Sequence, residues 1–323
     1  MTRLPRVSVV VPAHNAEAYL ERAVRSIYAT RYPDLQVLVV DDGSDDGTAA
    51  VTKRLRAEFG ESFVVARHAD GSKHGVAASR NLGITSSDGE WIAFLDADDF
   101  YLPHRFAAFE RLLESGGAGD GVYEIAEVRR EEAAPAAGVV APFKDGAMFG
   151  IQRDLTGAAL LEELLHGHCW ATSAITLRRE LLRKTGLFDV GKRIAEDCDL
   201  WFRLAAAGEL VGGDLENPVS VYWRHAGNTY EYDLRHRLAM LRAMSDSRHW
   251  VLAHAADRAA VMTAGVRKYL LRSMIALREG GRPDLAWQAW RQFLGADTAG
   301  ALAHPGVFRQ AWAACREARL AGL

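Results

Sequence analysis

Short apolar runs alternate with helical patterns through the N-terminal part of the chain. The apolar runs are rich in β-branched residues, which is typical of strands buried on both faces of a parallel sheet. They cover residues 6–11, 35–40, 63–67 and 91–95. Between them, apolar residues at helical spacing or helix-start signals predict helices over 16–29, 46–59 and 75–83. We therefore expect an α/β fold with a doubly wound sheet, in which ligands gather beyond the carboxyl ends of the strands.

The remainder of the chain is predicted to become wholly helical toward its end. Helices are expected over 156–166, 178–186 and 197–207, whereas two segments rich in Gly, Ala and Pro, 115–121 and 131–142, predict loops. From about Tyr232 onward the strand patterns stop, and further helices are expected at 234–256, 258–279, 283–294 and 305–320. These patterns predict an α/β domain over 1–232 and a helical region over 233–323, whose simplest role is structural packing.

Composition narrows the class of protein. The chain has 323 residues, 49% hydrophobic and 25% charged, with a formal net charge of −3, so nothing in it favours nucleic acid as a partner. No apolar run approaches the roughly 20 residues of a membrane-spanning helix, and Met1–Pro5 lacks the pattern of a signal peptide. The cysteines Cys169, Cys198 and Cys315 have no Cys-x-x-Cys spacing. We expect a reduced, cytoplasmic protein, with peripheral contact to the inner face of a membrane left open.

Three carboxylates follow the fourth predicted strand. Asp96, Asp98 and Asp99 come directly after the apolar run Trp91–Leu95. Carboxylates this close repel one another, and a divalent cation that also binds a phosphate is the favoured counter-charge. The alternative is an acidic turn that caps the next helix.

Two loops after the first and second strands form another candidate site. Pro12-Ala13-His14-Asn15 follows one strand and Asp41-Asp42-Gly43-Ser44 follows the other. Proline cannot donate to a ladder, so Pro12 is expected to end the first strand. A carboxylate at a strand end can accept the imide N–H of uracil or thymine. The alternative is turn and cap chemistry, which Asp-Gly and Asn favour regardless of function.

The helix start Gly75–Asn81 is rich in small residues. Such a start brings backbone amides close to an anion, and Arg80 or Lys73 is placed to pair with a phosphate. Close packing of the helix on the sheet explains the small residues equally well. Neither a P-loop nor a Gly-x-Gly-x-x-Gly motif is present, which argues against a P-loop NTPase or a typical dinucleotide dehydrogenase.

Two further groups lie in the second half of the chain. Glu196 and Asp197 open a predicted helix. They are either acidic residues that stabilise the first turn of this helix, or a pair in which one carboxylate acts as a general base. His225 follows a strand-like run and precedes a Gly-Asn turn. Its imidazole is a candidate manganese or magnesium ligand beside a diphosphate, with Arg224 as a phosphate contact, although a lone histidine is more often structural.

Taken in order, these pieces resemble the family 2 glycosyltransferases of the GT-A fold. The resemblance rests on VSVVVPAHN, VVDDGSDDGT, GVAASRNLGI, WIAFLDADD, AEDCDLWFRL and YWRHAGNT, between Val7 and about Thr229. It implies a Rossmann-like, doubly wound mixed sheet, with a nucleotide-sugar half over about 1–100 and an acceptor half over about 101–232. It also implies metal-dependent, inverting transfer of a sugar from a UDP- or dTDP-sugar. The Gln-x-x-Arg-Trp motif of processive synthases is absent, which points to transfer of a single sugar.

The resemblance also implies roles for individual residues. Asp197 would be the catalytic base and Glu196 would contact sugar or acceptor. Asp98 of the Asp-x-Asp motif and His225 would hold Mn²⁺ or Mg²⁺, while Asp96 would contact ribose or sugar. The residues expected to contact the nucleotide sugar are Pro12, Ala13, Asn15, Asp42, Lys73, Arg80, Asp96, Ala97 and Arg224.

Other functions stay open at this point. A sugar nucleotidyltransferase or metal-dependent phosphatase would use similar carboxylates, but their usual motifs are absent. A non-catalytic nucleotide-sugar-binding protein whose helical tail mediates interactions is the main alternative. The acceptor is open among saccharides, lipid-linked glycans, polymers and natural products, and self-association through the helical tail is open as well.

Overall fold

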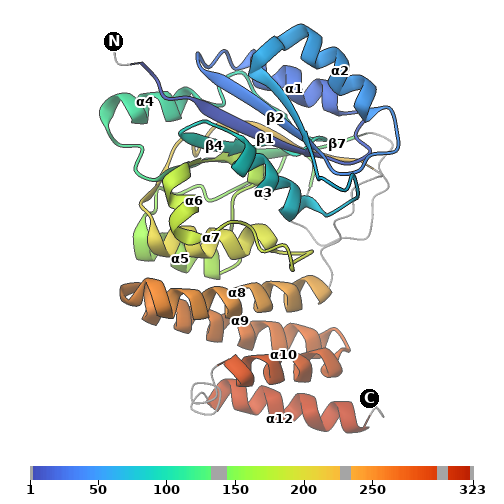
Figure 1. Ribbon diagram of the computed structural model, residues 1–323. Helices are drawn as coiled ribbons and strands as arrows, with labels where there is room; N and C mark the ends of the chain where they lie inside the picture. Colours follow the sequence, from blue (N-terminus) through green and yellow to red (C-terminus); the bar gives the residue numbers. More distant parts are fainter. Residues whose placement is uncertain (1–2, 132–143, 226–233, 297–304, 321–323) are drawn as a thin grey trace.

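The computed structural model describes residues 3–131, 144–225, 234–296 and 305–320. Within these ranges an α/β body is followed by helices that stack beneath it in successive layers, so that the two ends of the chain lie on opposite sides (Figure 1). This arrangement confirms the predicted α/β body and its helical C-terminal extension. The predicted loop 131–142 falls almost wholly outside the described residues.

The central sheet of the described part is mixed and has seven strands. In spatial order they are β10 (Leu210–Gly212), β6 (Gly121–Tyr123), β9 (Ile175–Arg178), β4 (Trp91–Phe94), β1 (Val7–Ala13), β2 (Leu35–Asp41) and β3 (Phe63–Arg67). β9 runs antiparallel to both of its neighbours, and the other pairings are parallel. The sequence predicted β1 to β4 but missed β6, β9 and β10, because these three short strands do not stand in a continuous apolar run.

Apolar cores lie on both faces of this sheet. Val9 and Val11 of β1 join a core with helices α1 (Leu20–Ala29), α2 (Thr48–Phe59) and α4 (Ala107–Ser115). Val10 faces a second core with α3 (Val76–Ser86), α5 (Gly157–Leu165), α6 (Arg179–Thr185) and α7 (Glu196–Ala207). Consecutive side chains of a strand point to opposite faces, so a strand covered on both sides must be apolar throughout.

Pro12 does not end β1, contrary to the expectation from the sequence. The strand continues to Ala13, and Pro12 pairs with Val40 of β2. On the other side, β4 accompanies β1 only as far as Val10. Pro12 therefore lies where β1 has a neighbour on one side only, and the missing N–H costs no pairing there.

A second, four-stranded sheet brings the last motif next to the acidic one. Its order is β5 (Phe100–Tyr101), β11 (Ser220–Arg224), β7 (Ala126–Arg130) and β8 (Met148–Phe149). β5 begins directly after Asp99 and pairs antiparallel with β11, which ends one residue before His225. This pairing carries His225 to the acidic loop. Residues 226–229 of that motif lie outside the described residues.

The helices of the C-terminal region share a core with the α/β body. They are α8 (Leu234–His254), α9 (Ala259–Glu279), α10 (Pro283–Ala296) and α12 (Pro305–Leu320), close to the predicted ranges. Met240 and Met244 of α8 are buried in the same core as Trp201 and Phe202 of α7. Figure 1 shows α8 lying beneath α5 and α7. A domain boundary at residue 232 stays a prediction, and that position is outside the described ranges.

Candidate active site

The carboxyl ends of β1, β2 and β4 lie at one edge of the central sheet, because these strands are parallel. The polar residues that follow them therefore come together. Asp42 is 4% exposed, and its N–H donates to the carbonyl oxygen of Ala13 over 2.8 Å.

Asn15 joins the loop after β1 to the loop after β2. It has a positive φ of 50°, donates its N–H to Ser44 Oγ and accepts a hydrogen bond from the N–H of Asp45. The predicted loops Pro12–Asn15 and Asp41–Ser44 are thus one connected structure.

Asp42 also ties this edge to the start of α3. Its two carboxylate oxygens accept hydrogen bonds from the N–H groups of His74 and Gly75, each over 2.8 Å. His68 Nε2 lies 3.5 Å from Asp42 Oδ1, and its ring stacks on that of His74. A carboxylate has about four acceptor positions, so Asp42 retains capacity for a further donor. His68 was not predicted as a site residue, because no motif surrounds it in the sequence.

The small residues of α3 serve close packing on the sheet. A Cβ atom added to Gly83 would lie 2.2 Å from Cγ1 of Val10, so only glycine fits there. Ala77 and Ser79 are buried on the same helix. The packing interpretation of this segment is therefore supported, and the amides of His74 and Gly75 at its start already donate to Asp42.

Arg80 connects the acidic loop to the start of α7. Its side chain is 4% exposed; Nη2 donates to Asp96 Oδ1 over 2.7 Å and Nη1 donates to Glu196 Oε1 over 3.0 Å. Asp96 and Glu196 hold the pKa of Arg80 above its ordinary value. The guanidinium expected to bind phosphate is thus shared between two carboxylates, and its first role is to neutralise them.

Asp98 and His225 meet at the end of the acidic loop. His225 Nε2 lies 3.1 Å from Asp98 Oδ2, although 127 positions separate them. Burial raises the pKa of Asp98, with the Asp96 charge as the next cause. The Tyr19 ring packs against His225 with centroids 4.4 Å apart. Arg22 donates to the carbonyl oxygen of Asp98 over 2.7 Å, and its guanidinium carbon lies 4.6 Å from the ring centroids of both Phe100 and Trp223. From the sequence, Tyr19 was predicted only as an apolar position of a helix, and Arg22 was not predicted as a site residue.

Asp99, the third carboxylate of the loop, faces inward. It is 3% exposed and accepts a hydrogen bond from the N–H of Trp223 over 2.8 Å. Burial raises its pKa well above the ordinary value. Asp99 therefore fixes β11 to the acidic loop, while Asp96 and Asp98 remain partly accessible, with side chains 33% and 31% exposed.

Glu196 and Asp197 form the first turn of α7. The residue before them, Ala195, is buried and has a positive φ of 62°, which makes the chain turn sharply into the helix. Burial raises the pKa of Glu196 to about 7, and the neighbouring Asp197 charge acts in the same direction. The N–H of Cys198 donates to Asp197 Oδ1 over 2.7 Å, which holds that carboxylate in place.

The remaining predicted residues lie around this cluster. Ala13 and Ala97 are buried in the core beneath the edge. Lys73 is exposed, and its backbone N–H lies in the loop that packs on Gly43. Arg224 Nη1 donates to the hydroxyl of Tyr222 over 3.2 Å. Two linked groups, Asp96–Arg80–Glu196 and Asp98–His225, therefore form the centre of the site.

A divalent cation fits the second of these groups. A carboxylate oxygen and an imidazole nitrogen suit Mn²⁺ or Mg²⁺, and both atoms come from side chains held by neighbours. No cluster of three or more His, Cys, Asp or Glu side chains able to hold a metal occurs within the described ranges. A cation bound here would therefore need further oxygen ligands, such as those of a diphosphate.

Comparison with known proteins finds glycosyltransferases. Residues 8–157 match the family described as glycosyl transferase family 2. This match covers a little less than half of the chain. It is 29% identical over 217 residues to EpsJ, an uncharacterized glycosyltransferase of Bacillus subtilis (strain 168), with 64% of this chain and 57% of the relative covered. An uncharacterized glycosyltransferase of Nostoc sp. (strain PCC 7120 / SAG 25.82 / UTEX 2576) is 28% identical, with 70% and 66% covered. The chain thus spans about three fifths of the length of these curated relatives.

Solved glycosyltransferase structures share the fold of this chain. S. aureus TarS 1-349 in complex with UDP-GlcNAc matches with a TM-score of 0.69 and 15% identity, covering 98% of this chain and 92% of TarS 1-349. The mannosyltransferase PcManGT from Pyrobaculum calidifontis in complex with GDP-Man and Mn²⁺ matches with a TM-score of 0.57 and 21% identity, covering 99% and 87%. These likenesses confirm the predicted GT-A type fold with its helical C-terminal part. Across the described ranges, no helix combines the length and apolarity needed to span a bilayer.

Proposed function

We propose that this protein transfers a single sugar, with inversion, from a UDP- or dTDP-sugar to an acceptor hydroxyl. The observation that carries the proposal is the pair of side-chain groups, Asp96–Arg80–Glu196 and Asp98–His225, at the strand edge of a domain that matches family 2. The TarS complex with UDP-GlcNAc supports the class of donor. Residues Pro12, Ala13, Asn15 and Asp42 would hold the base, with Asp42 accepting the imide N–H of uracil or thymine.

Asp197 is proposed as the general base. It takes the proton from the acceptor hydroxyl as that oxygen attacks the anomeric carbon from the face opposite the leaving diphosphate. The hydrogen bond from the Cys198 N–H occupies Oδ1 and thereby orients the carboxylate for this transfer. Arg80 neutralises Asp96 and Glu196 nearby, so that Asp197 is not surrounded by uncompensated charge. Glu196 is proposed to contact sugar or acceptor.

Asp98 and His225 are the residues that would hold Mn²⁺ or Mg²⁺. When bound, the cation would supply positive charge for the leaving diphosphate. Arg224 and Lys73 are proposed to add positive charge from the protein itself. The PcManGT complex with GDP-Man and Mn²⁺ supports this choice of cofactor. A cytoplasmic location, contact with a membrane surface and self-association stay predictions.

The substitution Asp197→Asn tests the proposal because asparagine keeps the shape but cannot take the proton. General-base help is typically worth about 10²–10⁴-fold, so the rate of sugar transfer should fall by that factor. Donor affinity, measured by calorimetry with UDP-sugars and Mn²⁺, should stay within about twofold. Asp257→Asn, an exposed carboxylate on the far helical region, is the control. An equal loss of transfer and of donor binding would refute the role of Asp197.

A further inference from the structure

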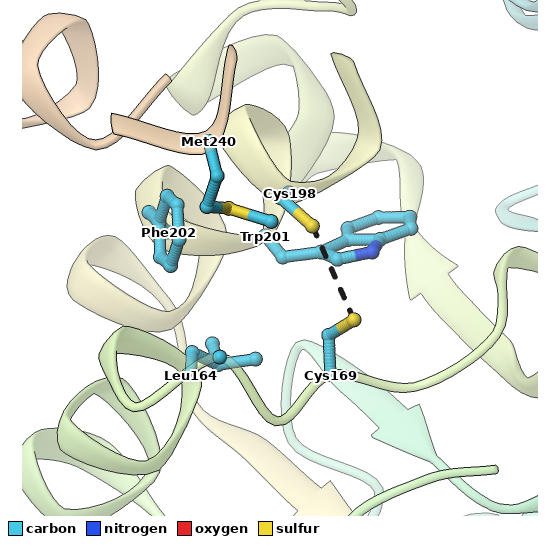
Figure 2. A pocket seen from close by; sticks show the side chains of 7 residues that line it. Leu164, Cys169, Cys198, Trp201, Phe202 and Met240 are labelled. Carbon is cyan, nitrogen blue, oxygen red and sulfur yellow. Dashed lines mark hydrogen bonds between the residues drawn. The ribbon is translucent and has the colours of Figure 1, made fainter. Parts of the chain in front are cut away.

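Two cysteines lie against each other directly beside the proposed base. Cys198 Sγ is 4.0 Å from Cys169 Sγ, although 29 positions separate them. Cys198 is buried in the first turn of α7, immediately after Asp197, whereas Cys169 is partly exposed in the segment between α5 and β9. Figure 2 shows the two sulfur atoms pointing toward each other from these separate segments. The third cysteine, Cys315, lies far away on α12.

The surroundings of this pair are apolar. Leu164, Trp201, Phe202 and Met240 line a narrow pocket around the sulfurs. A disulfide requires the sulfurs to close to about 2.05 Å. Cys169 lies outside helices and strands, whereas Cys198 is part of α7, so closing the bond draws an irregular segment and the first turn of a helix toward each other. Among the described residues no third ligand completes a metal site around the two sulfurs.

We propose that Cys169 and Cys198 form an intramolecular disulfide by exchange with a small-molecule disulfide such as oxidised glutathione. The accessible Cys169 thiolate attacks one sulfur of oxidised glutathione and releases one glutathione thiolate. The Cys198 thiolate then attacks the Cys169 sulfur and releases the second. The two protein thiols lose two protons and two electrons, and one oxidised glutathione becomes two reduced molecules.

The second step is expected to be slow at neutral pH. The hydrogen bond to Cys169 and burial both raise the pKa of the Cys198 thiol. Because the thiolate is the attacking form, ring closure should be faster at pH 8.5 than at pH 7. This order of events makes Cys169 the first thiol to react and Cys198 the resolving one.

The bond would also affect catalysis, and this part rests on the proposed function. Cys198 follows Asp197, and its N–H holds the Asp197 carboxylate. Pulling the Cys198 side chain toward Cys169 shifts the first turn of α7, so the oxidised protein should transfer sugar at least tenfold more slowly. A reducing agent should restore the rate.

The test uses the full chain incubated with oxidised glutathione at pH 8.5. Free thiols are then alkylated under denaturing conditions, and a non-reducing digest is analysed by mass spectrometry. A peptide joining Cys169 to Cys198, with Cys315 alkylated, is expected for the wild type. The variant Cys315→Ser should give the same product, and Cys169→Ser should give none. No reaction, or glutathione retained on Cys169 beside a free Cys198, would overturn the proposal.

Transfer assays on the same samples separate the two claims. Loss of transfer in the oxidised wild type, with Cys169→Ser unaffected, supports the effect on Asp197. A disulfide without loss of transfer overturns that effect alone. If no donor is used even by the reduced protein, the proposed function fails while the mass measurement still decides the disulfide.

Discussion

Arg80 Nη1 donates to Glu196 Oε1 over 3.0 Å, although 116 positions separate these residues along the chain. The same guanidinium donates to Asp96 through Nη2. One buried cation therefore joins the acidic loop after β4 to the first turn of α7. Without it, Asp96, Glu196 and Asp197 would repel one another across the centre of the site.

Arg80→Ala should destabilise the protein strongly. Removing one member of a buried ion pair leaves uncompensated charge and typically costs about 3–5 kcal/mol. Arg54→Ala is a matched control, because Arg54 is 62% exposed and pairs with Glu21 on the surface; such pairs are worth at most about 1 kcal/mol. Urea unfolding at pH 8 measures the loss of unfolding free energy for both variants. Equal losses for the two variants would contradict the role assigned to Arg80.

His225→Ala should weaken cation binding. We expect the affinity for Mn²⁺ in the presence of UDP to fall at least tenfold, or about 1.4 kcal/mol, because one of two protein ligands is lost. His249→Ala on α8, whose Nδ1 is hydrogen-bonded to the carbonyl oxygen of Ser245, should leave it unchanged. Calorimetric Mn²⁺ titrations measure both. In the wild type, a chelator should abolish transfer and added Mn²⁺ or Mg²⁺ should restore it, and full activity in excess chelator would exclude the cation.

Glu124 should make the protein less stable as pH rises from 5 to 8. Burial raises its pKa to about 7, against an ordinary value of 4.5, although Arg105, the buried partner of its ion pair, acts in the opposite direction. Between pH 4.5 and 7 the folded state therefore holds a proton on Glu124 that the unfolded state has lost. The contribution of this proton to the free energy of unfolding is full below pH 4.5 and declines as pH rises toward 7. The decline should be on the order of 1–3 kcal/mol, and Glu124→Gln should reduce it. Urea unfolding of both proteins at several pH values gives the difference; identical pH profiles would refute this role.

The shared core predicts that the α/β body and the C-terminal helices unfold together. Leu241 of α8 is 1% exposed within the core that contains Trp201. Leu241→Ala should cost about 2–5 kcal/mol and lower the melting temperature in one transition. Leu252→Ala, on the same helix but 44% exposed, should have little effect. Circular dichroism and calorimetry detect these transitions. Two separate transitions, only one of them shifted, would indicate independent domains.

Local patterns predicted the regular elements and the positions of several site residues. The buried strands at 6–11, 35–40, 63–67 and 91–95 were found as continuous apolar runs, and the C-terminal helices were found by their helical spacing of apolar residues. Parallel strands place the residues after Val11, Val40 and Leu95 at one edge, so Asn15, Asp42 and Asp96 were expected near one another. Short strands such as β6 and β9 escaped detection because they do not stand in a continuous apolar run.

Only the tertiary structure decided which distant groups meet. Nothing in the sequence around Arg80 indicates that it pairs with Glu196, and nothing around Cys169 indicates that its sulfur faces Cys198. Each of these contacts depends on how α3, α5 and α7 pack on the sheet. The sequence determined the elements and the chemistry each strand end carries, since these follow from neighbouring residues. The partners across the site depend on packing between elements remote in sequence, which local periodicity does not encode.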